Sequence, residues 1–385
     1  MDQSLYTVKQ MATTTLRQRE AINVFIDAGL RAISALGIDR VSVSHVAEMA
    51  KSSRPTFYAY FGDISGLWAE SWLAYGQEFL SKLSDPLYRL EVTSAEEKAR
   101  MGALLEIFTV SHRIPEVQEI VAPVAQNWWL SNRGSSEFSE LKLSWLTANR
   151  LGSWLTQPIE PKAIMSSIVE PILAMVGDKP SGVAADPRFE TLPEIRDPKS
   201  QDESLEGQLL DAVIRVIAKS GVTAASMTRI ARNAQVSTGT IYPRYSNGEE
   251  MLLDAFEYAI SQVTNENFGF INQTGFSPDQ FGAIVLAGLS DKRMTWRNFR
   301  VETHLHARVY SALAIRMRKA LETTNQRVAT GLGSLPISAG ERESIAFLIH
   351  TIGIGMALLQ NASIQVAEID HRLITREMIA AMARR

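Results

Sequence analysis

The sequence contains no cysteine among its 385 residues. Disulfide bonds and metal sites that use cysteine ligands are therefore excluded, and a reducing compartment is compatible with the chain. Long hydrophobic runs are also missing, because no stretch reaches the roughly eighteen consecutive apolar residues of a membrane span. The N-terminus lacks the basic-then-apolar form of a signal peptide. We therefore expect a cytoplasmic protein with no membrane partner.

The chain has little excess charge of either sign. Lysine and arginine number 39 against 42 aspartates and glutamates, which gives a formal net charge of −3. Proteins that bind nucleic acid strongly without regard to sequence are usually basic. Two short windows are nevertheless locally basic, Arg40–Tyr60 with three basic residues and one acid, and Arg229–Arg244 with three arginines and no acid. Any positive surface should be confined to these two windows.

Enzyme motifs are also missing. The sequence has no phosphate-cradling glycine-rich loop, no nucleophile elbow and no zinc-protease motif. One histidine pair, His304 and His306, stands out, but residues two apart on a helix point about 200° apart and cannot share a metal ion. We expect no enzyme, no cofactor and no metal site.

What the sequence does contain is a long internal repeat. The segment Ser53–Phe61 reappears as Ser237–Tyr245, 184 positions later (237 − 53), with small, apolar and aromatic residues in phase. The same offset places Gly37 on Gly221 and continues without a gap to Trp68. Chance rarely preserves such a pattern over this length, so the chain is an internal duplication.

Each copy predicts three short helices followed by a longer one. Gly37 and Gly221 stand where a helix ends in a residue with positive φ. Ser42 and Ser226 are placed to cap the next helix, and a second capping serine follows after a short turn. Two short helices joined by a tight turn and packed on a third make a helix-turn-helix unit.

These repeated segments resemble a known signature. Residues 41–61 (VSVSHVAEMAKSSRPTFYAYF) and 225–245 (ASMTRIARNAQVSTGTIYPRY) are similar to the DNA-binding signature of the tetracycline-repressor (TetR) family. The resemblance implies an all-α fold in which each helix-turn-helix is followed by a helical domain that binds a small effector and dimerises. Most members are homodimers with one such unit per chain, whereas this chain resembles two units fused.

The resemblance and the position of a proline-rich stretch divide the chain into five parts. We expect a first helix-turn-helix domain at 1–63, a helical ligand and pairing domain at 64–176, a linker at 177–203, a second helix-turn-helix domain at 204–247 and a second helical domain at 248–385. The linker contains four prolines and no apolar period, which is typical of an inter-domain connection.

The family pairs its last two long helices with those of a partner subunit. In this chain we expect Leu141–Leu155 and Pro161–Val176 to take the partner's place, so that the two halves pair with each other. Gly353 and Gly355 lie inside an apolar helix of the second half, where glycine destabilises by about 1 kcal/mol. A close helix–helix crossing is the expected compensation.

The resemblance also places residues at the DNA, in two regions that we call the first and second heads (1–63 and 204–247). Expected contacts in the first head are Ser42, Arg54, Pro55, Thr56, Tyr58 and Tyr60. In the second head they are Ser226, Thr238, Gly239, Thr240, Tyr242 and Arg244. Residues 1–15 are either a frayed terminus or an arm that touches the DNA backbone.

The two heads differ where bases are read. Arg54 can form a bidentate pair with guanine, whereas Thr238 offers a hydroxyl and a methyl group suited to thymine. An asymmetric operator follows. The family's turn glycine is replaced by Lys51 and Gln235, which must then adopt positive φ. Val236 precedes the second head's cap as in the family pattern, so we expect that head to follow the family more closely.

The effector cavity of the family lies in the helical domain among aromatic and apolar side chains. Candidates in the first half are Phe108, His112, Trp128, Trp129 and Trp145. Candidates in the second half are Phe268, Phe270, Trp296, Phe299, His304 and Tyr310. Most of these must be ordinary core residues. We expect one small apolar effector per chain, bound in the second half.

The function that follows is a DNA-binding transcriptional regulator, a repressor, acting as an intramolecular pseudo-dimer on double-stranded DNA. An effector would release it by moving the helices near 65–84 and 249–266. A dimer of such pseudo-dimers is the reserve expectation for its assembly. The alternative from another class is a protein-interaction scaffold built from two degenerate heads.

Overall fold

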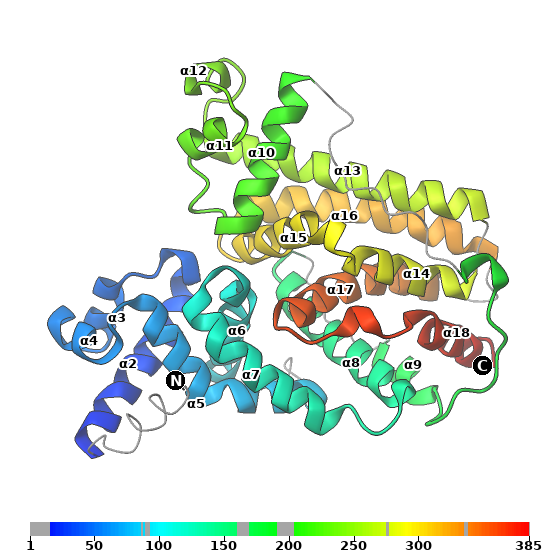
Figure 1. The fold of residues 1–385 in the computed structure, drawn as a ribbon, viewed down its shortest axis with the longest axis horizontal. Coiled ribbons are helices and arrows are strands. Elements are labelled where there is room, and N and C mark those ends of the chain that lie inside the picture. Colours follow the sequence, from blue (N-terminus) through cyan, green and yellow to red (C-terminus); the bar gives the residue numbers. More distant parts are fainter. Residues whose placement is uncertain are drawn as a thin grey trace, which may run out of the picture.

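The computed structural model describes residues 16–85, 88, 93–159, 169–190, 204–274, 277–334 and 338–384. Within these residues the regular structure is helical throughout, which confirms the all-α prediction. The two heads project from a helical body at separate corners (Figure 1). The N-terminal segment 1–15 lies outside the described residues.

The first half begins with the first head and continues into the body. Its helices are α2 (Leu16–Leu36), α3 (Val43–Met49), α4 (Arg54–Phe61), α5 (Ile64–Ser84), α6 (Ala95–Val110), α7 (Pro115–Asn132), α8 (Glu137–Thr156) and α9 (Val169–Met175). Short 3₁₀ turns follow α2, at Ile38–Arg40, and α6, at Ser111–Arg113.

The second half repeats this order with one additional helix, α14. Its helices are α10 (Leu205–Ser220), α11 (Met227–Asn233), α12 (Thr238–Ile241), α13 (Gly248–Thr274), α14 (Pro278–Leu289), α15 (Met294–Ala307), α16 (Ser311–Gly331), α17 (Ala339–Asn361) and α18 (His371–Ala383).

The local chemistry of the turns in each head is as expected. The Ser42 hydroxyl accepts the backbone N–H of His45 and caps α3, and the Ser226 hydroxyl does the same for α11. Lys51 and Gln235 have φ of 51° and 59°, so both replace the family's turn glycine in the left-handed region. That backbone is unfavourable for these side chains by about 1–2 kcal/mol. Packing of the surrounding helices must offset this strain.

The halves are joined most extensively by α8 and α17, with α9 and α18 completing a four-helix bundle. A Cβ on Gly355 would lie 1.8 Å from the carbonyl oxygen of Ala148, and one on Gly152 would lie 1.9 Å from that of Thr351. The two contacts are reciprocal, since 351 − 148 and 355 − 152 are both 203. The close crossing expected at Gly355 is present, and it joins α8 of the first half to α17 of the second. Gly353 differs, because it faces the side chain of Arg300 and not the backbone of another helix.

Reciprocal ion pairs add to this contact. Arg308 of the second half donates through Nε to Glu106 of the first at 3.0 Å. Arg113 of the first half donates through Nε to Glu302 of the second at 2.8 Å. Burial alone would lower the pKa of Arg113, but the carboxylates of Glu302 and Asp39 outweigh burial and raise it. Each half therefore supplies one arginine and one carboxylate to the other.

The described part of the linker is held against the second half. Phe189 is buried, and its carbonyl oxygen accepts a hydrogen bond from Arg372 of α18. The backbone N–H of Asp186 donates to Asp279 of α14 at 2.8 Å. The linker is thus anchored at Asp186 and Phe189, while most of residues 177–190 are exposed. The rest of the predicted linker, 191–203, lies outside the described residues.

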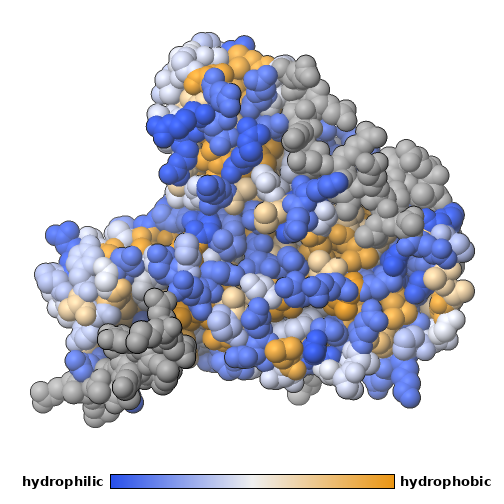
Figure 2. Space-filling model, viewed as in Figure 1, coloured by the Kyte–Doolittle hydropathy of each residue, from blue (hydrophilic) through white to orange (hydrophobic). Residues whose placement is uncertain are grey.

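Among the described helices, α17 is long and apolar enough to pass as a membrane span by length and composition alone. The structure gives another reason for its apolar character, because α17 packs against α8, α14, α15 and α16. Figure 2 shows hydrophobic side chains gathered over the body where α14, α17 and α18 lie, while the heads form separate lobes.

The close crossing predicts opposite effects for two glycine-to-alanine changes in α17. Gly355→Ala should destabilise the protein by about 2–3 kcal/mol, because its methyl group would overlap the Ala148 carbonyl. The matched control, Gly340→Ala, meets no atom within 4 Å and should be neutral or slightly stabilising. Thermal unfolding monitored by circular dichroism compares the two. Equal melting temperatures would contradict the crossing.

Candidate DNA-binding heads and effector cavity

The predicted contact residues of the first head lie on one exposed surface. Arg54 and Pro55 are exposed at the start of α4, and Tyr58 is 50% exposed one turn later. The Thr56 hydroxyl lies 2.7 Å from that of Ser53, so it belongs to the helix cap. The remaining two predicted contacts are Ser42, which is exposed, and Tyr60, which is half-buried against Phe25.

The second head presents an equivalent surface. Tyr242 is 60% exposed and Gly239 is exposed, while Thr238 is half-buried at the start of α12. The Thr240 hydroxyl lies 3.0 Å from that of Ser237, as in the first head. The other two predicted contacts, Ser226 and Arg244, are both exposed. Most of the candidates in each head are therefore exposed, while Thr56, Tyr60, Thr238 and Thr240 are partly buried.

Buried aromatic and apolar side chains anchor each short helix from below. Phe57 and Phe61 pack against Phe25 of α2 with ring centroids 5.6 and 5.7 Å from it. Ile241 and Tyr245 are buried at the same places in the second head. These four residues therefore belong to the core. The exposed tyrosines are thereby free to face a partner.

The helix with the residues predicted to read bases, which we call the recognition helix, is shorter in the second head than in the first. α4 spans eight residues and α12 only four. Pro55 lies in the first turn of α4, where no N–H partner is needed, whereas Pro243 would have to donate to Gly239 and cannot. The helix therefore ends at Ile241. The head that follows the family sequence more closely thus has the less regular helix.

Cations of the second head are available to an anionic partner. Arg232 and Arg244 are exposed, and no ion pair within the described chain involves either. Arg229 also makes no ion pair there and donates to the backbone carbonyl of Ala224. Exposed and uncompensated arginines next to a recognition helix suit phosphate contacts.

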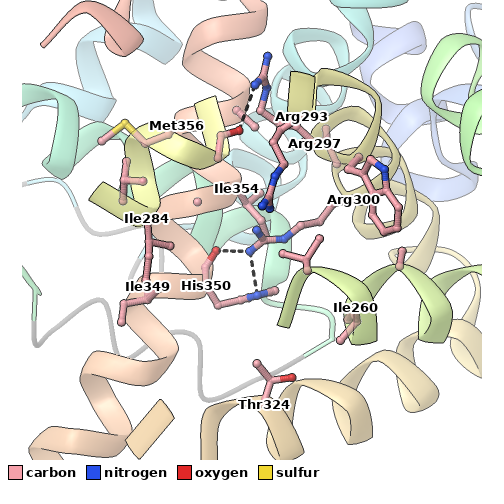
Figure 3. A pocket seen from close by; sticks show the side chains of 18 of the residues that line it. Ile260, Ile284, Arg293, Arg297, Arg300, Thr324, Ile349, His350, Ile354 and Met356 are labelled. Atoms are coloured by element: carbon pink, nitrogen blue, oxygen red, sulfur yellow. Dashed lines mark hydrogen bonds between the residues drawn. The ribbon is translucent and has the colours of Figure 1, made fainter. Parts of the chain in front are cut away.

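A cavity of about 200 Å³ opens inside the second half, between α13, α14, α15, α16 and α17. Of the candidates from the sequence, Trp296 and Phe299 line its wall. Figure 3 shows isoleucines from α13, α14 and α17 around the same space, at Ile260, Ile284 and Ile349. The wall is mostly apolar.

Other effector candidates lie off this wall. Phe108 and Trp128 are buried in the first half, and Trp145 donates through Nε1 to His371 of α18 at 3.0 Å, which makes it a contact between halves. His304 and Tyr310 lie in the second half but do not line the cavity. The side chains of Phe268 and Phe270 lie outside the described residues. His112 and Trp129 bond to Glu302 and Glu140.

Larger rings occupy the equivalent space in the first half. The offset of 184 places Trp72 where the second half has Phe256 and Phe79 where it has Val263, both of which line the cavity. Trp72 stacks on Phe108 with centroids 5.4 Å apart. The ring of Trp72 also lies 2.6 Å from where a Cβ on Gly76 would be. Aromatic packing therefore fills the first half, while smaller side chains leave room in the second.

The cavity also has a cationic side that the sequence analysis missed. Arg293, Arg297 and Arg300 line it, and the described lining includes no aspartate or glutamate. Their spacing of four and three residues puts them on one face of the segment that forms α15. That spacing was the sequence signal from which a cationic helix face could have been predicted.

Arg300 differs from the other two because it bonds to a histidine of α17. Its Nη2 donates to the His350 ring at 2.9 Å and to the His350 carbonyl at 2.7 Å, as the dashed lines in Figure 3 show. A Cβ on Gly353 would lie 3.1 Å from its Nη1, so this glycine makes room for the guanidinium. Burial lowers the pKa of Arg300 to about 10, which leaves it charged at neutral pH.

Hydrogen bonds define the protonation of the histidines beside Arg300. Since Arg300 donates to Nδ1 of His350, the proton of that ring is on Nε2, which donates to Nε2 of His304 at 3.2 Å. His304 then donates from Nδ1 to the Arg300 carbonyl at 2.6 Å. Burial lowers the pKa of His304 to about 3 and that of His350 well below its ordinary value. Both rings are neutral.

Comparison with known proteins identifies the heads. The family model for bacterial regulatory proteins, tetR family, matches this chain twice, at residues 25–70 and 209–255. Each match contains one complete helix-turn-helix, so each half of the chain carries one domain that matches the model of this family.

Two individual proteins are similar to parts of this chain. The fatty acid metabolism regulator protein of Bacillus subtilis (strain 168) is 36% identical over 78 residues, or 20% of this chain. The match spans 40% of that relative's own length. A solved transcriptional regulator from Rhodococcus sp. Rha1 is 21% identical over 47% of this chain and 97% of its own, with a TM-score of 0.41. That score is too low to support a conclusion.

The buried neutral histidines predict that acid unfolds the protein. The pKa values of His304, His350 and His371 lie below their ordinary value, with burial as the largest cause. The unfolded chain therefore binds more protons below about pH 6.5, so stability is present above that pH and is lost as pH falls towards about 4. Three such groups predict a loss of about 4 kcal/mol per pH unit near pH 5.

Urea denaturation at pH 7.5, 6 and 5 measures this slope. His371→Asn should reduce the slope by about one proton, since it removes one of the three groups. A free energy of unfolding that stays level from pH 7.5 to 5 would contradict the neutral buried rings.

Proposed function

We propose that this chain is a cytoplasmic transcriptional repressor that binds one asymmetric DNA operator as an intramolecular pseudo-dimer. A small molecule in the second-half cavity releases it. The observation that carries the proposal is the reciprocal crossing of α8 and α17, which joins two halves that each bear one DNA-binding domain. The surface that an ordinary family member uses for a second chain is thereby occupied within one chain.

The residues proposed to read bases differ between the two heads, and this difference supports an asymmetric operator. The first head offers Arg54 at the start of an eight-residue helix, and the second offers Thr238 at the start of a four-residue helix. An arginine can select guanine through two hydrogen bonds, and a threonine cannot. The exposed arginines of the second head favour DNA over the alternative of a protein scaffold, which has no need of uncompensated cations there.

Helix α15 supplies a route from the cavity to both heads. It lines the cavity, and it packs along α10 of the second head. Its Glu302 also bonds to Arg113, whose Nη2 donates to Asp39 at 2.6 Å in the first head. A shift of α15 would therefore be felt by both heads. An effector can bias their spacing only through its different affinity for the two arrangements.

The connecting helix α13 supplies a second route. It begins at Gly248, directly after the second head, and its Phe256 and Ile260 line the cavity. The equivalent residues of α5 are Trp72 and Gly76, which belong to the filled first half. We therefore place one effector per chain, and we keep the domain boundaries 1–63, 64–176, 177–203, 204–247 and 248–385 as part of the proposal.

The first test is the mass of the protein and of its complex with DNA. Light scattering should give the mass of one chain, 42.7 kDa, at micromolar concentration, and one chain should occupy one operator. A DNA fragment from the gene's own upstream region serves as the first probe, with a scrambled fragment as control. Two chains per operator would sink the pseudo-dimer and leave the reserve assembly.

Substitutions in the heads should act differently. Arg54→Ala removes a base contact and should weaken binding by about 1–3 kcal/mol while relaxing preference at one base pair. Tyr242→Phe removes only a phosphate hydrogen bond and should weaken all sequences alike. Gel shifts against an operator library compare the two. If Arg54→Ala leaves affinity and preference intact, the first head does not read bases.

A further inference from the structure

The cavity combines an apolar wall with buried positive charge. Three arginines enter it from the 3₁₀ turn η6 (Asp291–Arg293) and from α15, and no acidic residue is found in its described lining. Water does not match the apolar wall, and a purely apolar ligand does not match the positive charge. The arrangement suits a molecule with an apolar body and one negative group.

The three arginines are not equally satisfied. Arg293 forms an ion pair with Glu266, and Arg297 donates to the carbonyls of Gly288 and Ser290 at the end of α14. Arg300 makes no ion pair within the described chain, and its partners in the structure are the neutral ring and the carbonyl of His350. Arg297 also forms no ion pair among the described residues, but Asp291 partly offsets the lowering of its pKa by burial, whereas no described carboxylate acts on the pKa of Arg300. Arg300 is therefore the one of the three arginines without a nearby counter-charge.

A buried guanidinium without a carboxylate is unfavourable unless something compensates for its charge. The neighbouring His304 and His350 cannot compensate for this charge, because their hydrogen bonds fit two neutral rings. Gly353 keeps the space beside the guanidinium open, whereas a larger residue there would press on Nη1. The guanidinium of Arg300 is thus accessible from the cavity, whose wall is mostly apolar.

We propose that the second-half cavity binds a small amphipathic anion, whose carboxylate or phosphate pairs with Arg300 and whose apolar part packs among Ile260, Ile284 and Ile349. This inference rests on the proposed role of the cavity as the effector site, and it replaces the expectation of a purely apolar effector. Arginine suits the anion because its planar fork forms two parallel hydrogen bonds to a carboxylate or phosphate.

The size and charge of the site limit the ligand further. The space of about 200 Å³ exceeds the roughly 150 Å³ cavity that holds benzene, so a chain of about eight carbons or a two-ring aromatic group is a suitable body. A neutral analogue would leave Arg300 unpaired, and a cationic one would meet three arginines. Both should be rejected relative to the anion.

Calorimetry on the full chain without DNA tests this directly. The probes are octanoate, octyl phosphate and octan-1-ol, together with 2-naphthoate and 2-naphthalenemethanol as an aromatic pair. We expect at least one anion to bind at about one site per chain and about tenfold or more tighter than its neutral partner. The tighter of octanoate and octyl phosphate identifies the headgroup.

Arg300→Met should abolish this preference and leave octan-1-ol binding unchanged, since the apolar wall remains. Lys319→Met, an exposed position on α16 away from the lining, removes the same charge and should keep the preference. Retained alcohol binding shows that the cavity of the Arg300 variant is intact. Arg300→Lys provides a second variant, which should keep part of the preference.

Three outcomes would overturn the inference: equal affinity for anion and alcohol, failure of every probe to bind, or a preference that survives Arg300→Met. Gel shifts on the upstream DNA, run without any probe, report on the proposed regulator separately. A chain that binds its operator but shows no anion preference would sink this inference and leave the regulator standing.

Discussion

The architecture depends on a contact between two backbones. Where α8 and α17 cross, neither Gly152 nor Gly355 leaves room for a single methyl group, because each faces the carbonyl of a residue on the other helix. Such a crossing tolerates little sliding, since packed interiors respond to changes of one methylene. It therefore sets the relation of the two halves. The reciprocal pairs of Arg113 with Glu302 and Arg308 with Glu106 then form around it.

Duplication freed the two halves to diverge. In the first, Trp72 and Phe79 stack with neighbouring rings and fill the interior. In the second, Phe256 and Val263 occupy the equivalent positions and leave a cavity. A filled half gains buried apolar area, about 25 cal/mol per Å². The open half gives up some of that stability and keeps a buried arginine, which is the pattern expected of a binding site. The proposed ligand recognition and the structural support are then carried by different halves of one chain.

Much of the heads could be predicted from the sequence, because their structure is determined by local chemistry. Serine caps, the positive φ of Lys51 and the buried Phe57 follow from residue type and spacing. The presence of two such heads followed from the repeat. The cavity arginines were missed because aromatic residues were taken as the marker of a binding site, and which face of α15 meets α17 is a tertiary property. Gly353 was misassigned for the same reason, since its neighbour Arg300 lies 53 residues away in the sequence (353 − 300).

The central claim is that one chain presents two different heads to one operator. It is tested most directly with the natural operator and two derivatives, each made palindromic by copying one half-site over the other. Binding of the chain to all three is measured by gel shift, with native mass spectrometry of each complex. The account predicts that the natural operator binds most tightly, as one chain, because each head reads its own half-site. A palindromic derivative that binds as tightly as the natural operator, or a complex with two chains, would contradict it.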